Sequence, residues 1–438
     1  MLNVTRGAFL AYFASWSLFF SQSSVASSPY SAENQAAKAS TRMATYATAE
    51  KSHACVEDAI NIANSDALIF RVTPEQRQML FSTSNPEEFA LKFQDFIRHV
   101  RKAFDTEGVV VVRGLLEDDL LDRLEKDSQA IMDNSAPAIG GQFVSLNFGP
   151  AFSDTAFREA ALSSAIPRFI AMVLLQMKGG EDGDHVGRST SASLHLLKDA
   201  FLAKGGEKKC CGWHVDDVGF WPTDARSRPG VNAWIAIDDI PAEFGGGLAV
   251  SPRSHNASWR ERAYEMIGST RLYPEEGLAP GMPFGKTCDM EEADPDLAKT
   301  IDGTKKVFDF RRGDVLFHTR WLFHRSMPLT SDGEERFQRL DMEPTFKRYS
   351  IRYEYADSRL LKGINVEFAA LLNSENKGRT LAEVNKAEGP FYPKCWPGAV
   401  SDNDIDRMDD LVREKFPIAE ARRKELFKTL MQGNTAKK

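Results

Sequence analysis

Residues 231–237 read Val-Asn-Ala-Trp-Ile-Ala-Ile, a short run rich in the β-branched and aromatic residues that favour strands. Further short runs come before and after it, separated by turns that contain Gly and Pro. They lie at residues 192–201, 213–220, 248–251, 307–310, 314–318 and 349–355. A succession of short strands is typical of a double-sheet sandwich. The sequence therefore predicts a mainly β fold of the jelly-roll type with flanking helices.

Helices are predicted before this run of strands. Apolar residues recur at helical spacing over residues 86–104, where Asn85 and Pro86 are suited to a cap and a first turn. Residues 109–112 form a β-branched run that is long enough for one strand. A polar and apolar pattern over residues 117–132 then predicts a second helix.

The composition predicts a folded protein for which we do not expect nucleic acid as a partner. The chain has 438 residues, of which 42% are hydrophobic and 27% charged, so we expect a sizeable buried core. Its formal net charge of -7 and its pI near 5.8 lack the basic excess of phosphate-binding proteins. Five cysteines without CxxC spacing predict neither a disulfide framework nor a zinc site.

The first 26 residues have the features of a secretory signal peptide or another targeting leader. Arg6 precedes an apolar run over residues 7–20, and small residues at 24–26 offer a cleavage point. This run is shorter than the roughly 20 residues that cross a bilayer, so cleavage is favoured over the alternative, an uncleaved membrane anchor. We expect no stable membrane span after leader removal and a location in the secretory pathway or an organelle. A glycosylation sequon at Asn256 is consistent with the former.

Four further regions are expected after the leader. Residues 27–85 are predicted to be a linker, because much of this stretch is rich in Ser, Ala and Thr and has no sustained apolar period. Residues 86–356 form the expected catalytic domain. Within it, residues 257–300 are rich in Glu, Pro and Gly and are interpreted as an insertion over the mouth of the sandwich. Residues 357–438 are expected to form a helical C-terminal extension that supports the domain and has no chemistry of its own.

The residues with the most informative spacing are His214 and Asp216. One residue separates them within a predicted strand, so alternation places both side chains on one face, where they can reach one ion. A third ligand must come from elsewhere, and His318 and His324 lie on or just after a later strand. Two imidazoles and one carboxylate on one side of iron leave positions open for a chelating cosubstrate and O2.

A lone His-x-Asp triplet often arises by chance, but here the surrounding motifs add specificity. The runs 213–220, 234–239, 246–255 and 313–317 resemble the phytanoyl-CoA dioxygenase family in order and spacing. The resemblance extends over residues 104–356. It implies a double-stranded β-helix, the jelly-roll or cupin-like sandwich, and an oxygenase that depends on Fe(II), 2-oxoglutarate and O2.

The family resemblance also implies roles for individual residues. The His-x-Asp pair supplies His214 and Asp216, and the His-x-Ser motif that follows Gly-Asp-x-x-x-Phe supplies His324 as the distal iron ligand, with His318 as the runner-up. Ser326 and a downstream Arg are then expected to bind the far carboxylate of 2-oxoglutarate, while Trp234 packs beside this cosubstrate. An Arg suits the task because its rigid fork can hold a carboxylate with two hydrogen bonds.

The sequence departs from the family pattern at this Arg. Glu335 stands at the position where the family usually has it. We therefore interpret residues 330–345 as a loop insertion and predict that Arg348 binds 2-oxoglutarate. Arg352 and Arg336 are the alternatives.

The reaction implied is hydroxylation of a small-molecule or lipid-like substrate, coupled to decarboxylation of 2-oxoglutarate to succinate and CO2. Halogenating relatives replace the metal-binding carboxylate with a small residue, so Asp216 favours hydroxylation. A cupin-like protein that binds another metal for non-oxidative work, and a binding protein without catalysis, are the competing hypotheses.

Other polar residues have simpler interpretations. His195 lies in an apolar strand and is expected to be a core histidine with its hydrogen bonds satisfied. Lys204 either assists the cosubstrate or faces solvent. His255 is expected to be a structural cap or hydrogen-bond donor, and Asp217 points away from Asp216 on an ideal strand.

Overall fold

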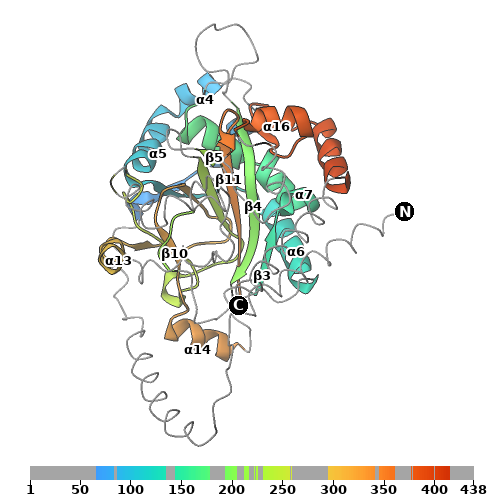
Figure 1. Cartoon of the computed structure of the whole chain (residues 1–438). Helices are drawn as coiled ribbons and strands as arrows, with labels where there is room; N and C mark the ends of the chain where they lie inside the picture. Colours follow the sequence, from blue (N-terminus) through green and yellow to red (C-terminus); the bar gives the residue numbers. More distant parts are fainter. Residues whose placement is uncertain are drawn as a thin grey trace, which may run out of the picture.

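The predicted jelly roll is confirmed, with two sheets packed face to face and the helices of the first half of the chain on the outer side of the larger sheet (Figure 1). The computed structural model describes residues 66–82, 86–134, 144–177, 193–204, 212–216, 221, 223–224, 230–256, 258, 294–340, 345–360, 376, 378–398 and 400–414.

The larger sheet has eight strands, and its order is far from the order along the chain. From one edge of the sheet to the other, seven of these strands are β1 (Ile69–Arg71), β2 (Val109–Arg113), β9 (Val315–Thr319), β6 (Val231–Ala236), β11 (Phe346–Tyr355), β4 (Leu194–Lys204) and β13 (Lys394–Trp396). The eighth, β3 (Ser145–Phe148), also pairs with β4. All neighbours are antiparallel except β1 and β2.

Two shorter sheets complete the described strands. One comprises β10 (His324–Ser326), β7 (Leu248–Val250) and β8 (Lys306–Val307), and the other pairs β5 (Thr223–Asp224) with β12 (Arg359–Leu360). Alternation along β6 places Trp234 in an apolar cluster between the sheets, whereas Ala233 and Ile235 belong to the cluster beneath the helices. The space between the sheets is therefore a separate compartment from the helix-covered core.

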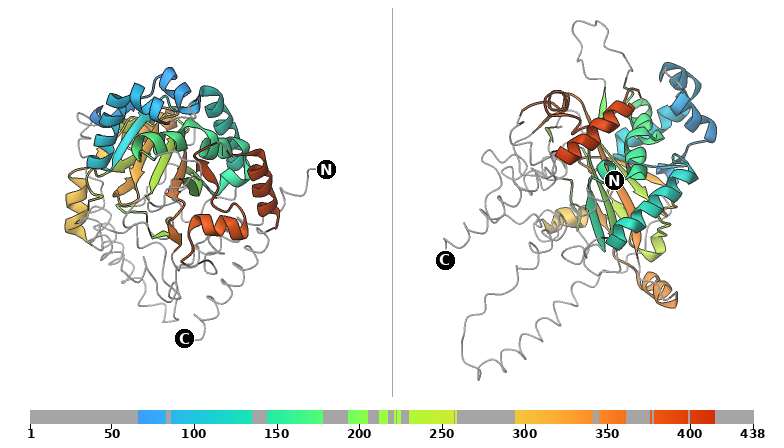
Figure 2. Two further views of the ribbon diagram at one scale, coloured as in Figure 1. Left: turned by 90° about the horizontal axis from the view of Figure 1, so that it is seen from above. Right: turned by 90° about the vertical axis from the view of Figure 1, so that its right-hand side faces the viewer.

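Helices from the first half of the chain cover one face of the large sheet (Figure 2). They are α3 (Pro74–Ser82), α4 (Pro86–Lys92), α5 (Gln94–Glu107), α6 (Asp118–Asn134), α7 (Pro150–Ser153), α8 (Thr155–Arg158) and α9 (Ala165–Phe169), with π-helical turns η5 (Glu159–Ser163) and η6 (Ile170–Leu174). Helix α5 ends because Gly108 adopts a positive φ of 77°, which lets the chain reverse into the buried strand β2.

Several sequence-based boundaries differ from the structure. The single helix predicted over residues 86–104 is two helices, α4 and α5, with Phe93 between them in a non-helical conformation. The strand predicted over residues 213–220 is reduced to one bridging residue, His214, and residues 217–220 lie outside the described part of the chain. The loop expected over residues 330–345 contains helix α14 (Ser331–Arg339), whose start is capped by the Thr330 hydroxyl.

The two ends of the domain also extend beyond the predicted bounds. The linker expected over residues 27–85 is folded from Asp66 onward, because β1 pairs with β2 and α3 packs against the core. The expected helical extension contains helix α16 (Leu381–Glu388) and further helical residues at 402–414, but it also adds strand β13 to the edge of β4. The expected leader, residues 1–26, lies outside the described residues.

No helix in the described part of the chain has the length and apolar character needed to cross a membrane. Most of the interior of the expected insertion, residues 259–293, is outside the described residues. The described part of this region that follows it is helix α13 (Pro295–Asp302), which lies beside the short sheet of β10 (Figure 1).

Candidate metal centre

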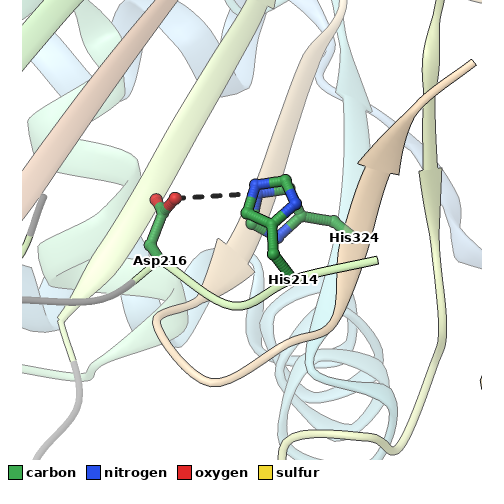
Figure 3. A group of neighbouring side chains, drawn as sticks. All are labelled: His214, Asp216 and His324. Carbon is green, nitrogen blue, oxygen red and sulfur yellow. Dashed lines mark ion pairs between the residues drawn. The ribbon is translucent and has the colours of Figure 1, made fainter. Parts of the chain in front are cut away.

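Backbone pairing brings together two histidines that are 110 positions apart in the sequence. The His214 amide donates to the His324 carbonyl at 3.0 Å, and the His324 amide donates back at 2.9 Å. Their rings lie on the same side of this pair, with centroids 4.3 Å apart (Figure 3). The alignment follows from β10, which continues past His324 to pair with β7.

Asp216 completes a group of three possible ligands. Its Oδ1 lies 3.7 Å from His324 Nε2, and one ligand atom from each of His214, Asp216 and His324 lies within 4.8 Å of the others (Figure 3). The carboxylate and the distal imidazole are buried, and His214 is partly buried. Two imidazole nitrogens and a carboxylate oxygen at this spacing can hold one divalent metal ion.

Hydrogen bonds to the backbone set the orientation of both imidazoles. Nδ1 of His214 donates to the Gly212 carbonyl at 2.8 Å, and Nδ1 of His324 donates to the Leu322 carbonyl at 3.0 Å. Each Nε2 is therefore the nitrogen without a proton, which is the form that binds a metal. Burial also lowers the pKa of His324 to about 4, so this imidazole is neutral at neutral pH.

Arg352 on β11 fixes the carboxylate. Its Nε and Nη2 lie 3.0 and 2.9 Å from Oδ2 of Asp216, which leaves Oδ1 on the side of the histidines. Burial favours the protonated acid, but the positive charge of Arg352 outweighs it and holds the pKa of Asp216 well below its usual value. Asp216 is therefore a carboxylate with one oxygen already oriented.

Substitution of Arg352 with Met is expected to make metal binding more sensitive to acid. Arg352 lowers the pKa of Asp216 and also that of His324, so its removal raises both. A metal is lost as pH falls through these pKa values, and the variant should release it at a pH about one unit or more above wild type. Metal content measured against pH tests this, with Arg352→Lys as the variant that should recover part of the difference. Identical curves of metal release against pH for Arg352→Met and wild type would contradict this expectation.

His318, the alternative distal ligand, is committed to other hydrogen bonds. Its Nδ1 donates to the Thr319 carbonyl at 2.8 Å, and its Nε2 accepts from Asn232 Nδ2 at 2.8 Å. Asn232 is held in turn by the Ser350 hydroxyl at 3.0 Å. The His318 ring lies beside the His324 ring, with centroids 4.8 Å apart and ring planes tilted by 45°. The geometry therefore favours His324 as the ligand and His318 as part of the wall.

A second polar group forms beside the triad, from the three residues expected to contact the cosubstrate. Arg348 is only 3% exposed, and its Nη2 donates to the Ser326 hydroxyl at 3.1 Å. Its guanidinium carbon lies 5.9 Å from the centre of the Trp234 ring. By contrast, Arg336 is exposed on α14 and lies over the Phe244 ring, and Arg352 is engaged by Asp216. The geometry therefore favours Arg348 among the three arginines.

Alternation along β11 explains why these groups share one wall. Arg348, Ser350 and Arg352 are two residues apart and face the space between the sheets, while Tyr349 and Ile351 enter the helix-covered core. Sequence reasoning did not identify the contact between Arg352 and Asp216, nor the role of Asn232. The spacing of polar residues on β11 was a usable signal, but the partners of Ser350 and Arg352 are more than a hundred positions away.

The remaining sequence expectations can be compared with their surroundings. His195 is buried and its Nδ1 lies 2.7 Å from the Tyr392 carbonyl, as expected of a satisfied core histidine. His255 lies with Nε2 3.2 Å from the Asp105 carbonyl, consistent with a hydrogen-bond donor. Lys204 is 1% exposed, so it does not face solvent. Asp217 falls outside the described residues.

A jelly roll with two imidazoles and a carboxylate around one point defines a class of proteins, the metal-dependent oxygenases with a facial triad. The family model of phytanoyl-CoA dioxygenase matches residues 104–337, and the chain belongs to this family. The family uses Fe(II), 2-oxoglutarate and O2. Among proteins with curated descriptions, none matches the sequence.

The comparison with solved structures gives matches of low sequence identity. The non-haem α-ketoglutarate-dependent carbocyclase SnoK from nogalamycin biosynthesis is 18% identical, with 67% of this chain and 94% of that chain covered and a TM-score of 0.47. EctD from S. alaskensis with 2-oxoglutarate and 5-hydroxyectoine is 16% identical, covering 68% and 84%, with a TM-score of 0.40. HygX from Streptomyces hygroscopicus, with nickel and 2-oxoglutarate bound, is 16% identical, covering 57% and 83%, with a TM-score of 0.34.

Proposed function

We propose that this protein is an Fe(II)- and 2-oxoglutarate-dependent oxygenase that hydroxylates a small-molecule or lipid-like substrate. His214, Asp216 and His324 would hold the iron. When bound, iron supplies the oxidative chemistry, in which one oxygen atom of O2 enters the substrate and the other enters succinate as 2-oxoglutarate loses CO2. The chain itself binds, orients and shields the reactants.

The donor set fits ferrous iron. Both imidazoles have Nδ1 engaged by a backbone carbonyl, and Asp216 is kept ionised by Arg352. These contacts orient three metal-binding atoms in the absence of metal. Three protein ligands would leave further coordination positions for other ligands. The presence of a carboxylate at position 216 is the observation that carries the proposed hydroxylation, because a halogenating site needs that position open.

The chain also offers a site for the cosubstrate. A carboxylate bound at Arg348 would meet a planar guanidinium that the Ser326 hydroxyl already helps to orient, with the Trp234 ring alongside. Such a charge-assisted pair is strong because it is buried and has directional hydrogen bonds. Ser326 lies two residues after His324 on β10, so the same strand would serve both the metal and the cosubstrate.

The proposal is tested with purified protein that is loaded with Fe(II) without oxygen and then given O2 and 2-oxoglutarate. Succinate release that depends on iron is expected, and it should increase when a substrate from a panel of small metabolites and lipids is present. Detection of an added oxygen in that substrate by mass spectrometry identifies hydroxylation. Bound iron without succinate under any of these conditions would instead indicate non-oxidative metal binding, and no bound iron would indicate a protein without this catalysis.

A further inference from the structure

The two segments that carry the candidate ligands have an outer face that the proposed chemistry does not use. Trp213 and Val215 alternate with His214 and Asp216, and Phe323 directly precedes His324. These three flanking residues are buried in one apolar cluster with residues of α13, namely Leu297, Ala298 and Ile301. Helix α13 therefore packs on the back of both ligand-bearing segments at once.

One carboxylate at the end of this helix contacts both segments. Asp302 Oδ1 accepts a hydrogen bond from Trp213 Nε1 at 3.1 Å and lies 3.9 Å from Arg325 Nη1. The Arg325 guanidinium carbon also lies 5.8 Å from the centre of the Trp213 ring. Trp213 precedes His214 and Arg325 follows His324, so Asp302 joins the immediate neighbours of the two histidines.

The position of Asp302 is itself well determined. Its other oxygen, Oδ2, lies 3.0 Å from Lys305 Nζ, and α13 begins at a cap in which the Asp294 carboxylate accepts from the Leu297 amide at 3.1 Å. The Asp302 side chain is 31% exposed, so its ion pairs are partly screened by solvent and the hydrogen bond to Trp213 is its most directional contact. A capped and packed helix thus holds the carboxylate in place.

We propose that Asp302 is a positioning residue for the metal centre. Its contacts with Trp213 and Arg325 hold the two ligand-bearing segments together and so set the separation of the two imidazoles. Helix α13 thereby supports the metal site. This inference rests on the proposed function insofar as the triad binds a metal. The sequence predicted an insertion over residues 257–300. Helix α13, which begins within this stretch, would then connect the insertion to the candidate iron ligands.

The test compares Fe(II) dissociation constants, measured without oxygen, for wild type, Asp302→Ala, Asp302→Asn and Trp213→Phe. Asp302→Ala should weaken Fe(II) binding by roughly ten-fold, the lower end of the effect of groups that orient metal ligands. Asp302→Asn keeps an oxygen for Trp213 and should recover part of the loss. The double variant Asp302→Ala with Trp213→Phe should bind Fe(II) more tightly than the sum of the two single effects predicts. Both substitutions remove the same contact, the hydrogen bond between Trp213 and Asp302.

Asp296→Asn is the matched control, since Asp296 is an exposed acid in the first turn of the same helix and should leave Fe(II) binding unchanged. Thermal unfolding of the metal-free proteins separates positioning from folding. Loss of melting temperature with an unchanged Fe(II) dissociation constant in both Asp302 variants would overturn the inference. Wild-type protein that binds no metal would overturn it together with the proposed function. Metal binding without succinate release would count against the oxygenase reaction alone, and a weakened Asp302→Ala variant would still support the inference.

Discussion

Replacement of His324 with Ala is expected to lower Fe(II) affinity by more than about 100-fold and to remove succinate formation. The magnitude exceeds the roughly 10- to 100-fold effect of residues that only orient a ligand, because the change removes a metal-binding nitrogen. The backbone bonds between residues 214 and 324 do not depend on the side chain, so the variant should fold. Iron content of the purified protein and circular dichroism together test this expectation.

Two further histidine variants sharpen the result. His99→Ala is the matched control, because His99 is exposed on α5, and its iron content should equal that of wild type. His318→Gln tests the rejected ligand, and it should retain most of the Fe(II) affinity since His318 uses both nitrogens within the protein. Full iron content in His324→Ala, combined with its loss in His318→Gln, would reverse the assignment.

The second large effect is expected at the cosubstrate. Arg348→Ala should raise the KM for 2-oxoglutarate on the order of 100-fold, because loss of one partner of a buried charged pair costs about 2–5 kcal/mol. Fe(II) affinity should change little, because Arg348 donates to Ser326, lies beside Trp234 and is not itself a candidate metal ligand. Succinate formation at varied 2-oxoglutarate concentration gives the KM, and equilibrium dialysis gives the metal affinity.

The comparison with other arginines identifies the site of binding. Arg348→Lys should recover only part of the affinity, because an ammonium cannot reproduce the two-pronged geometry. Arg336→Ala should match wild type, since Arg336 is exposed on α14. A normal KM in Arg348→Ala would mean that 2-oxoglutarate binds elsewhere and would remove the basis for this half of the proposed site.

Much of the fold and of the candidate triad could be predicted because the relevant signals are local. The β-branched run at residues 109–112 becomes a fully buried strand, and the run at 231–237 becomes β6 nearly to the residue. His214 and Asp216 are separated by one position, and the family motifs pointed to His324 for the third. These features are set by periodicity and short spacing, which a single sequence displays directly.

What could not be predicted depends on contacts between distant parts of the chain. Arg352 was a candidate for 2-oxoglutarate, yet it holds Asp216, which is 136 positions away. The helix at α14 was missed because its residues are almost all polar and exposed, so it has no apolar period. Strand β13 was missed because a three-residue strand gives too short a pattern, and its pairing with β4 is a property of the folded chain.

The two-sided use of β11 links the chemistry of this protein to its stability. Arg348, Ser350 and Arg352 line the space between the sheets, and Tyr349, Ile351 and Tyr353 fill the helix-covered core. A slip of a single residue in this strand would exchange the two sets, burying three polar groups among apolar side chains. Evolution can therefore change what β11 presents to a ligand one side chain at a time, but it cannot insert or delete one residue there without disrupting the interior as well.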